Sequence, residues 1–218
     1  MKIAVFEGGY DRNFGYLIWC PGSRRAALID AATEVAPIQA ALQERGLKLT
    51  YLLLTHTHGD HLAYLTDWVG LYPQLEVAGH ARPLRGDLSN YRGLSDNAEV
   101  NLGNCRLNML VTPGHYPDCV CWYDEAGGVL FTGDTVFIGR TGRTIGPLSS
   151  TPQLYRSLAT RILPLPPETV IYPGHNYGPT PTATLAELQA TSDFFRCATE
   201  AQFRDVMTRY ERERRPGD

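Results

Sequence analysis

Three histidines and an aspartate lie close together in the segment Thr-His-Thr-His-Gly-Asp-His, residues 55–61. His56 and His58 are two positions apart, a spacing that directs both side chains to the same face of an extended segment. Helical zinc pairs are spaced i and i+4 instead. Imidazole nitrogens and carboxylate oxygens both bind divalent transition metals. The segment therefore predicts a metal site on a loop that follows a strand, where Asp60 and His61 turn toward the same point.

Two further histidines and another aspartate occupy similar places, each directly after an apolar run that predicts a strand. A single histidine is more often a surface or core residue than a ligand, and that interpretation holds for His80. Asp60 and Asp134 could each be only a cap or turn residue. Because five of the six histidines lie at such strand ends, a shared metal centre is the better interpretation. The additional candidates are His115 after residues 105–111, Asp134 after residues 129–131 and His175 after residues 169–172.

The first half of the chain has the pattern of a sheet meander followed by a strand–helix–strand unit. Apolar runs separated by glycine and proline predict the strands. Apolar residues at helical spacing predict a helix that Thr33 caps and Gly46 ends. The last strand of this unit ends where residues 55–61 begin. The expected elements are strands at 3–6, 14–20, 26–30, 49–54 and 75–78, a second helix over about 61–71 and a polar connection over 82–97.

The second half repeats this logic, because its strands also stop at candidate ligands. Residues 120–123 and 129–131 predict a hairpin. We find no short-period repeat and no linker, so the chain is expected to form one α/β domain over residues 1–218, with 181–218 as a helical appendage packed on it. Three further helices are expected, with caps at Thr151-Pro152, Thr184 and Thr199, the last two in capping boxes.

Charge and hydropathy narrow the expected partners. The formal net charge is −3, from 20 basic and 23 acidic side chains, so no overall field favours nucleic acid or an anionic membrane. No apolar stretch approaches the roughly 18 residues of a membrane span, and residues 1–6 predict a strand, not a secretion signal. We therefore expect a cytoplasmic protein with a small-molecule substrate and without a nucleic-acid or membrane partner. The sequence leaves the oligomeric state open.

The cysteines agree with a reducing compartment. There are five, an odd number, and their spacing does not form a disulfide framework. Cys119 and Cys121 could be taken for a metal or redox pair. Because they lie in an apolar run, we interpret them as small core residues.

The candidate ligands together resemble the full pattern of the metallo-β-lactamase-fold superfamily: His-x-His-x-Asp-His at 56–61, then His115, Asp134 and His175. The resemblance implies a four-layered αββα sandwich, with the metals at one edge of its two sheets and short helices at the C-terminus. β-Lactamases usually carry cysteine at the position of Asp134, which argues against β-lactam hydrolysis. The resemblance further implies one metal site from His56, His58 and His115, a second from Asp60, His61 and His175, and a bridge by Asp134.

Such a centre activates water. Two metals share a water, lower its pKa toward about 7 and polarise a scissile carbonyl, so ester and thioester hydrolysis need little else from side chains. Asp60 and Asp134 are the carboxylates that we assign to catalysis. Mixed nitrogen and oxygen ligation suits several metals. We expect two divalent ions, zinc first, with iron and manganese as the alternatives.

The motifs around the ligands are similar to those of the glyoxalase II and persulfide dioxygenase branch, which acts on glutathione conjugates. The motifs are Thr112-Pro-Gly-His, Phe131-Thr-Gly-Asp-Thr and Tyr172-Pro-Gly-His-Asn-Tyr. The leading prediction is a metal-dependent hydrolase of a thioester or related acyl compound, similar to glyoxalase II. The alternative is a persulfide dioxygenase acting on glutathione persulfide. For this alternative the resemblance implies one iron at His56, His115 and Asp134, with the other ligands retained. A third interpretation is a sensor or binding module without catalysis.

Four residues are candidates for binding the substrate, which the resemblance suggests is a glutathione conjugate. Arg140 and Arg143 lie in a glycine-rich segment and could clamp a substrate carboxylate. The alternative is a solvated turn with structural salt bridges. Tyr177 and Tyr116 each follow a candidate ligand, and each could offer a hydroxyl to the substrate or only pack at the rim.

Overall fold

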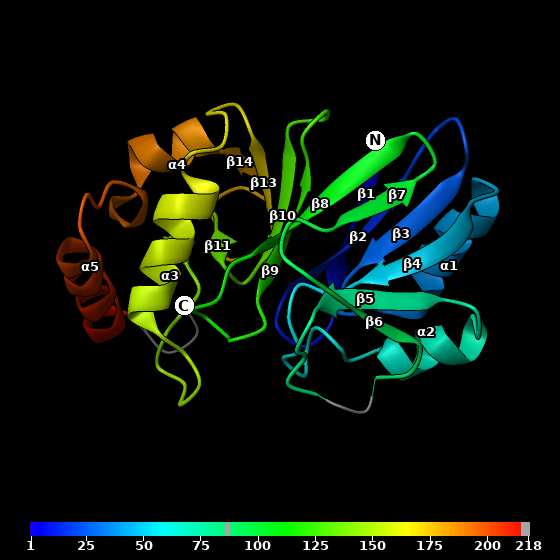
Figure 1. The fold of residues 1–218 in the computed structure, drawn as a ribbon, viewed down its shortest axis with the longest axis horizontal. Coiled ribbons are helices and arrows are strands. Elements are labelled where there is room, and N and C mark those ends of the chain that lie inside the picture. The colour runs from blue at the N-terminus through cyan, green and yellow to red at the C-terminus, as the bar shows by residue number, and fades with distance from the viewer. Residues whose placement is uncertain (86–87, 215–218) are drawn as a thin grey trace.

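A computed structural model describes residues 1–85 and 88–214. Two six-stranded sheets face each other and helices cover the outer side of each sheet, as Figure 1 shows. This arrangement confirms the predicted αββα sandwich. The layers follow from the sequence, because strands buried on both faces need a partner sheet on one side and helices on the other.

The first sheet has the strand order β1-β2-β3-β4-β5-β6. Its first three strands are antiparallel, and β3 to β6 are parallel neighbours. Because β4 is an interior strand, its end delivers residues 55–61 to the middle of one sheet edge. The elements are β1 Lys2–Gly8, β2 Asn13–Trp19, β3 Arg25–Ile29, α1 Val35–Glu44, β4 Lys48–Leu53, α2 Leu65–Leu71, β5 Glu76–His80 and β6 Tyr91–Leu94.

The second sheet has the order β14-β13-β10-β9-β8-β7. A small two-stranded sheet, β11-β12, follows β10. The strands are β7 Glu99–Leu102, β8 Cys105–Val111, β9 Val120–Asp124, β10 Val129–Gly133, β11 Val136–Phe137, β12 Arg140–Thr141, β13 Val170–Pro173 and β14 Ala183–Thr184. The helices are α3 Thr151–Ser157, continued by a π-helical turn at Leu158–Ile162, then α4 Leu185–Thr191, a 3₁₀ turn at Asp193–Phe195 and α5 Glu200–Glu213.

Three apolar clusters hold the layers together. The central one lies between the two sheets and includes the fully buried Trp122 and Phe131. A second cluster packs α1 and α2 against the first sheet. The third packs α3, α4 and α5 against the second sheet and contains the buried Cys121, which agrees with its predicted role as a core residue.

Five local predictions were wrong. The α1 N-cap is Glu34 and not Thr33, and the α3 N-cap is Ser150 and not Thr151, which is the first residue of the helix. Helix α2 begins at Leu65 and not near 61, because His61 turns inward and the following turns bond to Gly59 and Ala31 instead. The second capping box is partial: Thr199 caps α5, but the Gln202 side chain accepts from Ala198. The connection 82–97 contains the strand β6, a short polar edge strand that exists through pairing with β5.

The C-terminal helices α4 and α5 pack on the second sheet and α3. Thr184 forms the predicted capping box with Glu187. The division of residues 1–218 into one domain with an appendage at 181–218 stays a prediction. Within the described ranges, no helix combines the length and the apolar composition that crossing a bilayer needs. The cytoplasmic location likewise stays a prediction.

Candidate metal centre

The seven predicted ligands meet at one edge of the sandwich. They come from the segments that follow β4, β8, β10 and β13. In each of two groups, the potential ligand atoms all lie within 4.8 Å of one another. The structure thus brings together every residue that the sequence singled out for this role. The first group is His56, His58, His115 and Asp134, and the second is Asp60, His61 and His175.

The first group converges on the His58 ring. Its Nδ1 atom lies 3.0 Å from His56 Nε2 and 3.1 Å from His115 Nε2. If the rings are neutral, three ring nitrogens that face one point do not have enough N–H groups between them to satisfy all their lone pairs. A cation at that point would satisfy all three lone pairs.

The ligand atoms of the second group also converge on one point, and Asp134 lies between the two groups. His61 Nε2 is 3.3 Å from His175 Nε2, and Asp60 Oδ2 is 3.3 Å from His175 Nε2. Asp134 directs Oδ1 to His61 Nε2 at 3.1 Å and Oδ2 to His115 Nε2 at 3.5 Å. Its two oxygens therefore face different groups, which is the placement that a bridging ligand needs.

Asp134 also shows that the residues fit divalent metals. Its side chain is only 10% exposed, and its Oδ1 lies 3.1 Å from His61 Nε2 and 3.4 Å from His175 Nε2. A buried carboxylate is costly unless cationic groups compensate its charge, and a divalent ion would do so once the two imidazoles are neutral. Both groups offer the mixed nitrogen and oxygen ligands that transition metals accept.

The outer nitrogens of the rings are held by other parts of the chain. His61 Nδ1 lies 2.7 Å from Asp30 Oδ2, His115 Nδ1 lies 2.9 Å from the Arg143 carbonyl, and His175 Nδ1 lies 2.8 Å from the Asp11 carbonyl. An oxygen acceptor at Nδ1 keeps the proton there and leaves the Nε2 lone pair free for a metal. The rings are thus oriented before any metal binds.

Sequence reasoning missed several of these supporting residues. Asp30 accepts from the Thr55 amide and hydroxyl, each at 2.7 Å, in addition to its contact with His61. It closely follows β3, so the strand-end rule that found the ligands could have found it. Asn13 donates to Asp60 Oδ2 at 2.8 Å, and no local pattern marks it. Asp118 accepts from the Thr57 hydroxyl and so holds the loop between two ligands.

The charges in the centre compensate one another. Burial disfavours the charged form of His61, but Asp134 and Asp30 outweigh it and raise its pKa well above the usual value. Burial also opposes protonation of His175, but Asp134 raises the pKa of His175 to about 10. Burial raises the pKa of Asp134, and His175 and His61 outweigh this and hold it well below the usual range. Two imidazolium ions therefore balance the carboxylates in the metal-free protein.

Metal uptake by the metal-free protein should consequently release about two protons at neutral pH, because a ligating imidazole must be neutral. A histidine whose pKa is raised stays protonated until the pH passes that raised value. The release should therefore stay nearly constant from about pH 6 to pH 8, whereas histidines titrating near 6.5 would give almost none by pH 8. Calorimetry in buffers of different ionisation enthalpy measures the number, and a release that vanishes by pH 8 would contradict the charge balance described above.

Three of the four predicted substrate residues line a cavity of about 240 Å³ beside the centre, and Tyr116 does not line it. The Tyr116 ring lies on the His58 ring, with 4.1 Å between centroids. Tyr177 stacks parallel to His175 at 4.6 Å and donates its hydroxyl to Asp11, so its hydroxyl already has a partner. The cavity is lined by Asp11, His115, Asp134, Phe137, Arg140, Arg143, Tyr177 and Arg214.

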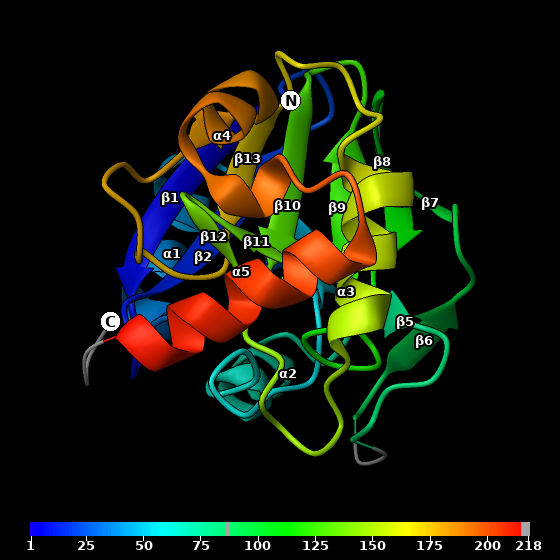
Figure 2. The same cartoon turned by 90° about the vertical axis from the view of Figure 1, so that its left-hand side faces the viewer.

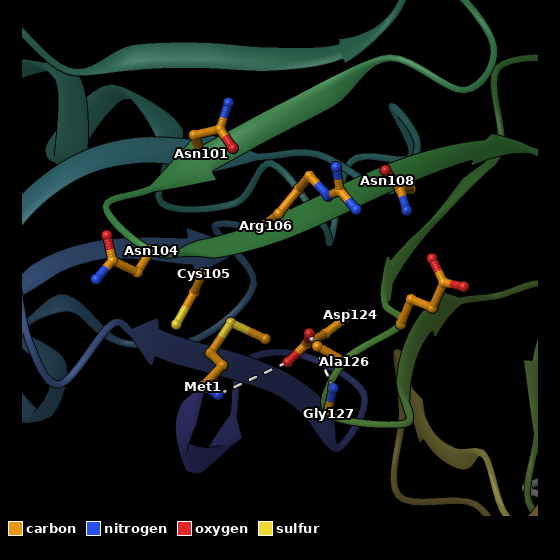
Figure 3. A pocket seen from close by; sticks show the side chains of 10 residues that line it. Met1, Asn101, Asn104, Cys105, Arg106, Asn108, Asp124, Ala126 and Gly127 are labelled. Atoms are coloured by element: carbon orange, nitrogen blue, oxygen red, sulfur yellow. Dashed lines mark hydrogen bonds and ion pairs between the residues drawn. The ribbon is translucent and has the colours of Figure 1, made fainter.

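A larger hollow of about 580 Å³, shown in Figure 3, lies at the other end of the sandwich. Strand β8 begins at this hollow with Cys105 and leads to His115 at the metal edge. Asn101, Arg106 and Asp124 are among its lining residues. Among the described residues, only the two groups above have the geometry of a metal site. The smaller cavity is therefore the candidate active site.

The fold and the paired histidine–aspartate groups define a class, and comparison with known families agrees with it. Residues 9–175 match the model of the metallo-beta-lactamase superfamily, and the chain belongs to that family. It is an enzyme of this superfamily with a metal-binding cluster of histidines and aspartates.

The relatives identify the branch. The chain is 34% identical over 177 residues to human mitochondrial persulfide dioxygenase ETHE1, covering 80% of this chain and 68% of the relative. It is 33% identical over 194 residues to a hydroxyacylglutathione hydrolase of Rhodopseudomonas palustris strain HaA2, covering 89% and 72%. The crystal structure of ETHE1 from Myxococcus xanthus superposes with a TM-score of 0.82 at 27% identity, covering 95% of this chain and 90% of that one. These relatives confirm the predicted branch and include both activities at nearly equal identity.

Proposed function

We propose that this protein is a hydrolase of a thioester or related acyl compound that uses two divalent metal ions. The observation that carries the proposal is the position of Asp134, whose two oxygens face two separate groups of ligands. The second group is complete, and Asn13 holds its carboxylate Asp60 in place. This second group is therefore available to hold a second ion.

The residues would share the work as follows. His56, His58 and His115 would hold one ion, Asp60, His61 and His175 the other, and Asp134 both. Bound metals would supply a hydroxide at neutral pH and polarise the acyl carbonyl. Asp134 would offset the concentrated positive charge. The acceptors at the outer ring nitrogens would keep the imidazoles fixed, so that little reorganisation is needed during the reaction.

The second candidate is a mononuclear iron persulfide dioxygenase. The similarity to human ETHE1 supports it as strongly as the similarity to the hydrolase supports the first candidate. His56, His115 and Asp134 belong to one group, which by itself can hold one ion. In this case the second group would have no catalytic metal.

Metal analysis and two assays separate the candidates. We expect protein purified without added metal to contain close to two ions per chain and to hydrolyse S-acyl glutathione thioesters. One iron per chain, with oxygen uptake on glutathione persulfide and no thioester hydrolysis, would establish the dioxygenase instead. The variant His80→Gln is the matched control, since His80 lies outside both groups and contacts Arg82. It should retain the metal content and the activity of the wild type.

A further inference from the structure

The hairpin after Asp134 and helix α5 form one wall of the candidate active site. Phe137 and Arg140 are register partners in the β11–β12 hairpin. Figure 2 shows α5 running across this small sheet. The Thr141 hydroxyl donates to Met207 Sδ at 3.5 Å, so the hairpin contacts α5 directly. The predicted glycine-rich turn is therefore covered by a helix from the end of the chain.

Arg143 forms an ion pair with Glu211 of α5. Its Nε and Nη2 atoms each donate to a different oxygen of Glu211, both at 2.7 Å. The two side chains are 31% and 21% exposed, so the pair is partly shielded from water. The hydrogen bond from Arg143 holds the pKa of Glu211 below its usual range, and Glu211 raises the pKa of Arg143. The guanidinium fork that could clamp a carboxylate is thus satisfied within the protein.

Arg140 has a different environment. Its guanidinium carbon lies 4.6 Å from the centre of the Tyr177 ring, 5.0 Å from that of Phe137 and 5.4 Å from that of Tyr210. Stacking uses the faces of the guanidinium and leaves its N–H groups, which lie in its plane, for other partners. No carboxylate of the described residues forms an ion pair with Arg140. The aromatic side chains fix the cation without neutralising it.

The other charged groups of this wall do not change that balance. Asp11 lines the same cavity and accepts the Tyr177 hydroxyl, whereas Glu211 forms its hydrogen bonds with Arg143 and acts on Arg140 only through a weaker electrostatic interaction. Arg214 also lines the cavity and already has an interaction of its own. A ligand in this cavity therefore meets the candidate metal centre at His115 and Asp134, the Asp11 carboxylate, and the guanidinium of Arg140, which has no carboxylate bonded to it among the described residues.

We propose that Arg140 is the anion-binding residue of this site and that the ion pair with Glu211 keeps Arg143 from binding the substrate. The site would then select a substrate with a single carboxylate beside its acyl group. The part of this inference that concerns the acyl group rests on the proposed hydrolase function, whereas the binding of the carboxylate by Arg140 does not. A planar carboxylate suits the in-plane N–H donors of a stacked guanidinium. Arg140 and Glu211 would thus be specificity-determining residues, and α5 would set the charge that the cavity accepts.

Direct binding tests the proposal without turnover. The protein as purified is titrated by calorimetry with 3-(methylthio)propanoate, with the neutral amide of the same acid, and with 3,3′-thiodipropanoate, which has two carboxylates. We expect the wild type to prefer the monocarboxylate over the amide by about tenfold or more, the size of a charge-assisted pair. Absence of this preference would overturn the proposal.

The variants assign the preference to one arginine. Arg140→Gln should remove most of it, and Arg140→Lys should keep part of it, because charge remains without the planar fork. Arg143→Gln should change the preference for the monocarboxylate over the amide by less than about threefold. Glu211→Gln should raise the affinity for the dicarboxylate by about tenfold, because the substitution leaves the Arg143 guanidinium without its carboxylate partner. If Arg143→Gln abolishes the preference and Arg140→Gln keeps it, Arg143 is the anchor and the proposal is wrong.

The control is Arg204→Gln, a change of the same type on the exposed side of α5, where Arg204 pairs with Glu200. It should leave all three affinities unchanged. Thermal unfolding of each variant excludes misfolding as the cause. If the thioester is not hydrolysed but Arg140 binds the carboxylate, the hydrolase proposal fails and the anion site stands. If the thioester is hydrolysed but the protein shows no preference for the carboxylate, the hydrolase proposal stands and the anion-site proposal fails.

Discussion

Replacing Asp134 with asparagine should lower kcat/KM for the proposed thioester hydrolysis by about a thousandfold or more, since in the proposed two-metal centre the shared carboxylate would support both the nucleophile and the charge of the two metals. Asparagine has nearly the same shape but removes the negative charge and one acceptor oxygen. The neutral side chain would leave the repulsion between the two proposed ions uncompensated. We therefore expect the metal content to fall from two ions per chain to one or fewer.

Elemental analysis and steady-state kinetics measure the two effects on the same preparation. Asp67→Asn is the control, because Asp67 is an exposed aspartate of α2 outside both groups. A variant Asp134→Asn that keeps two ions and near-normal activity would show that Asp134 does not bridge the metals. The bridging assignment would then have to be abandoned, although the rest of the centre could remain.

The second large effect should come from Asp30→Asn, a residue that does not touch the metals. Asp30 accepts three hydrogen bonds, from the Thr55 amide, the Thr55 hydroxyl and His61 Nδ1. Its φ is +57°, a left-handed conformation that asparagine tolerates, so the substitution changes hydrogen bonding and not backbone strain. The amide offers one acceptor oxygen in place of two and cannot serve all three donors.

Loss of the partner of His61 should weaken metal binding at the second group by about 10- to 100-fold. The free energy of unfolding of the metal-free protein should fall by about 1–3 kcal/mol, the cost of a buried donor left without an acceptor. Competition with a chelator measures the first effect and denaturant unfolding the second.

Asp124→Asn separates the two effects. Asp124 is also a buried aspartate, 3% exposed, and accepts from the Gly127 amide beside the hollow of Figure 3. Its replacement should reduce stability but leave metal affinity unchanged. Equal losses of metal affinity in both variants would indicate general destabilisation and not a positioning role for Asp30.

The sequence by itself singled out the residues that meet in the candidate metal centre. The reason is local: a buried strand is a continuous apolar run, so the polar residues that interrupt it mark the strand end. His56 after β4, His115 after β8 and His175 after β13 all follow this rule. The same locality made the Thr184 capping box and the core role of Cys121 predictable.

Only the tertiary structure decided how the centre is supported and what its arginines can bind. Asp30 reaches His61 and Asn13 reaches Asp60 across 31 and 47 residues, and no short pattern encodes such contacts. Arg140 and Arg143 looked equivalent in the sequence, because they lie three residues apart in one glycine-rich segment. Their environments differ because α5, more than 55 residues further along the chain, places an aromatic ring against Arg140 and a carboxylate against Arg143.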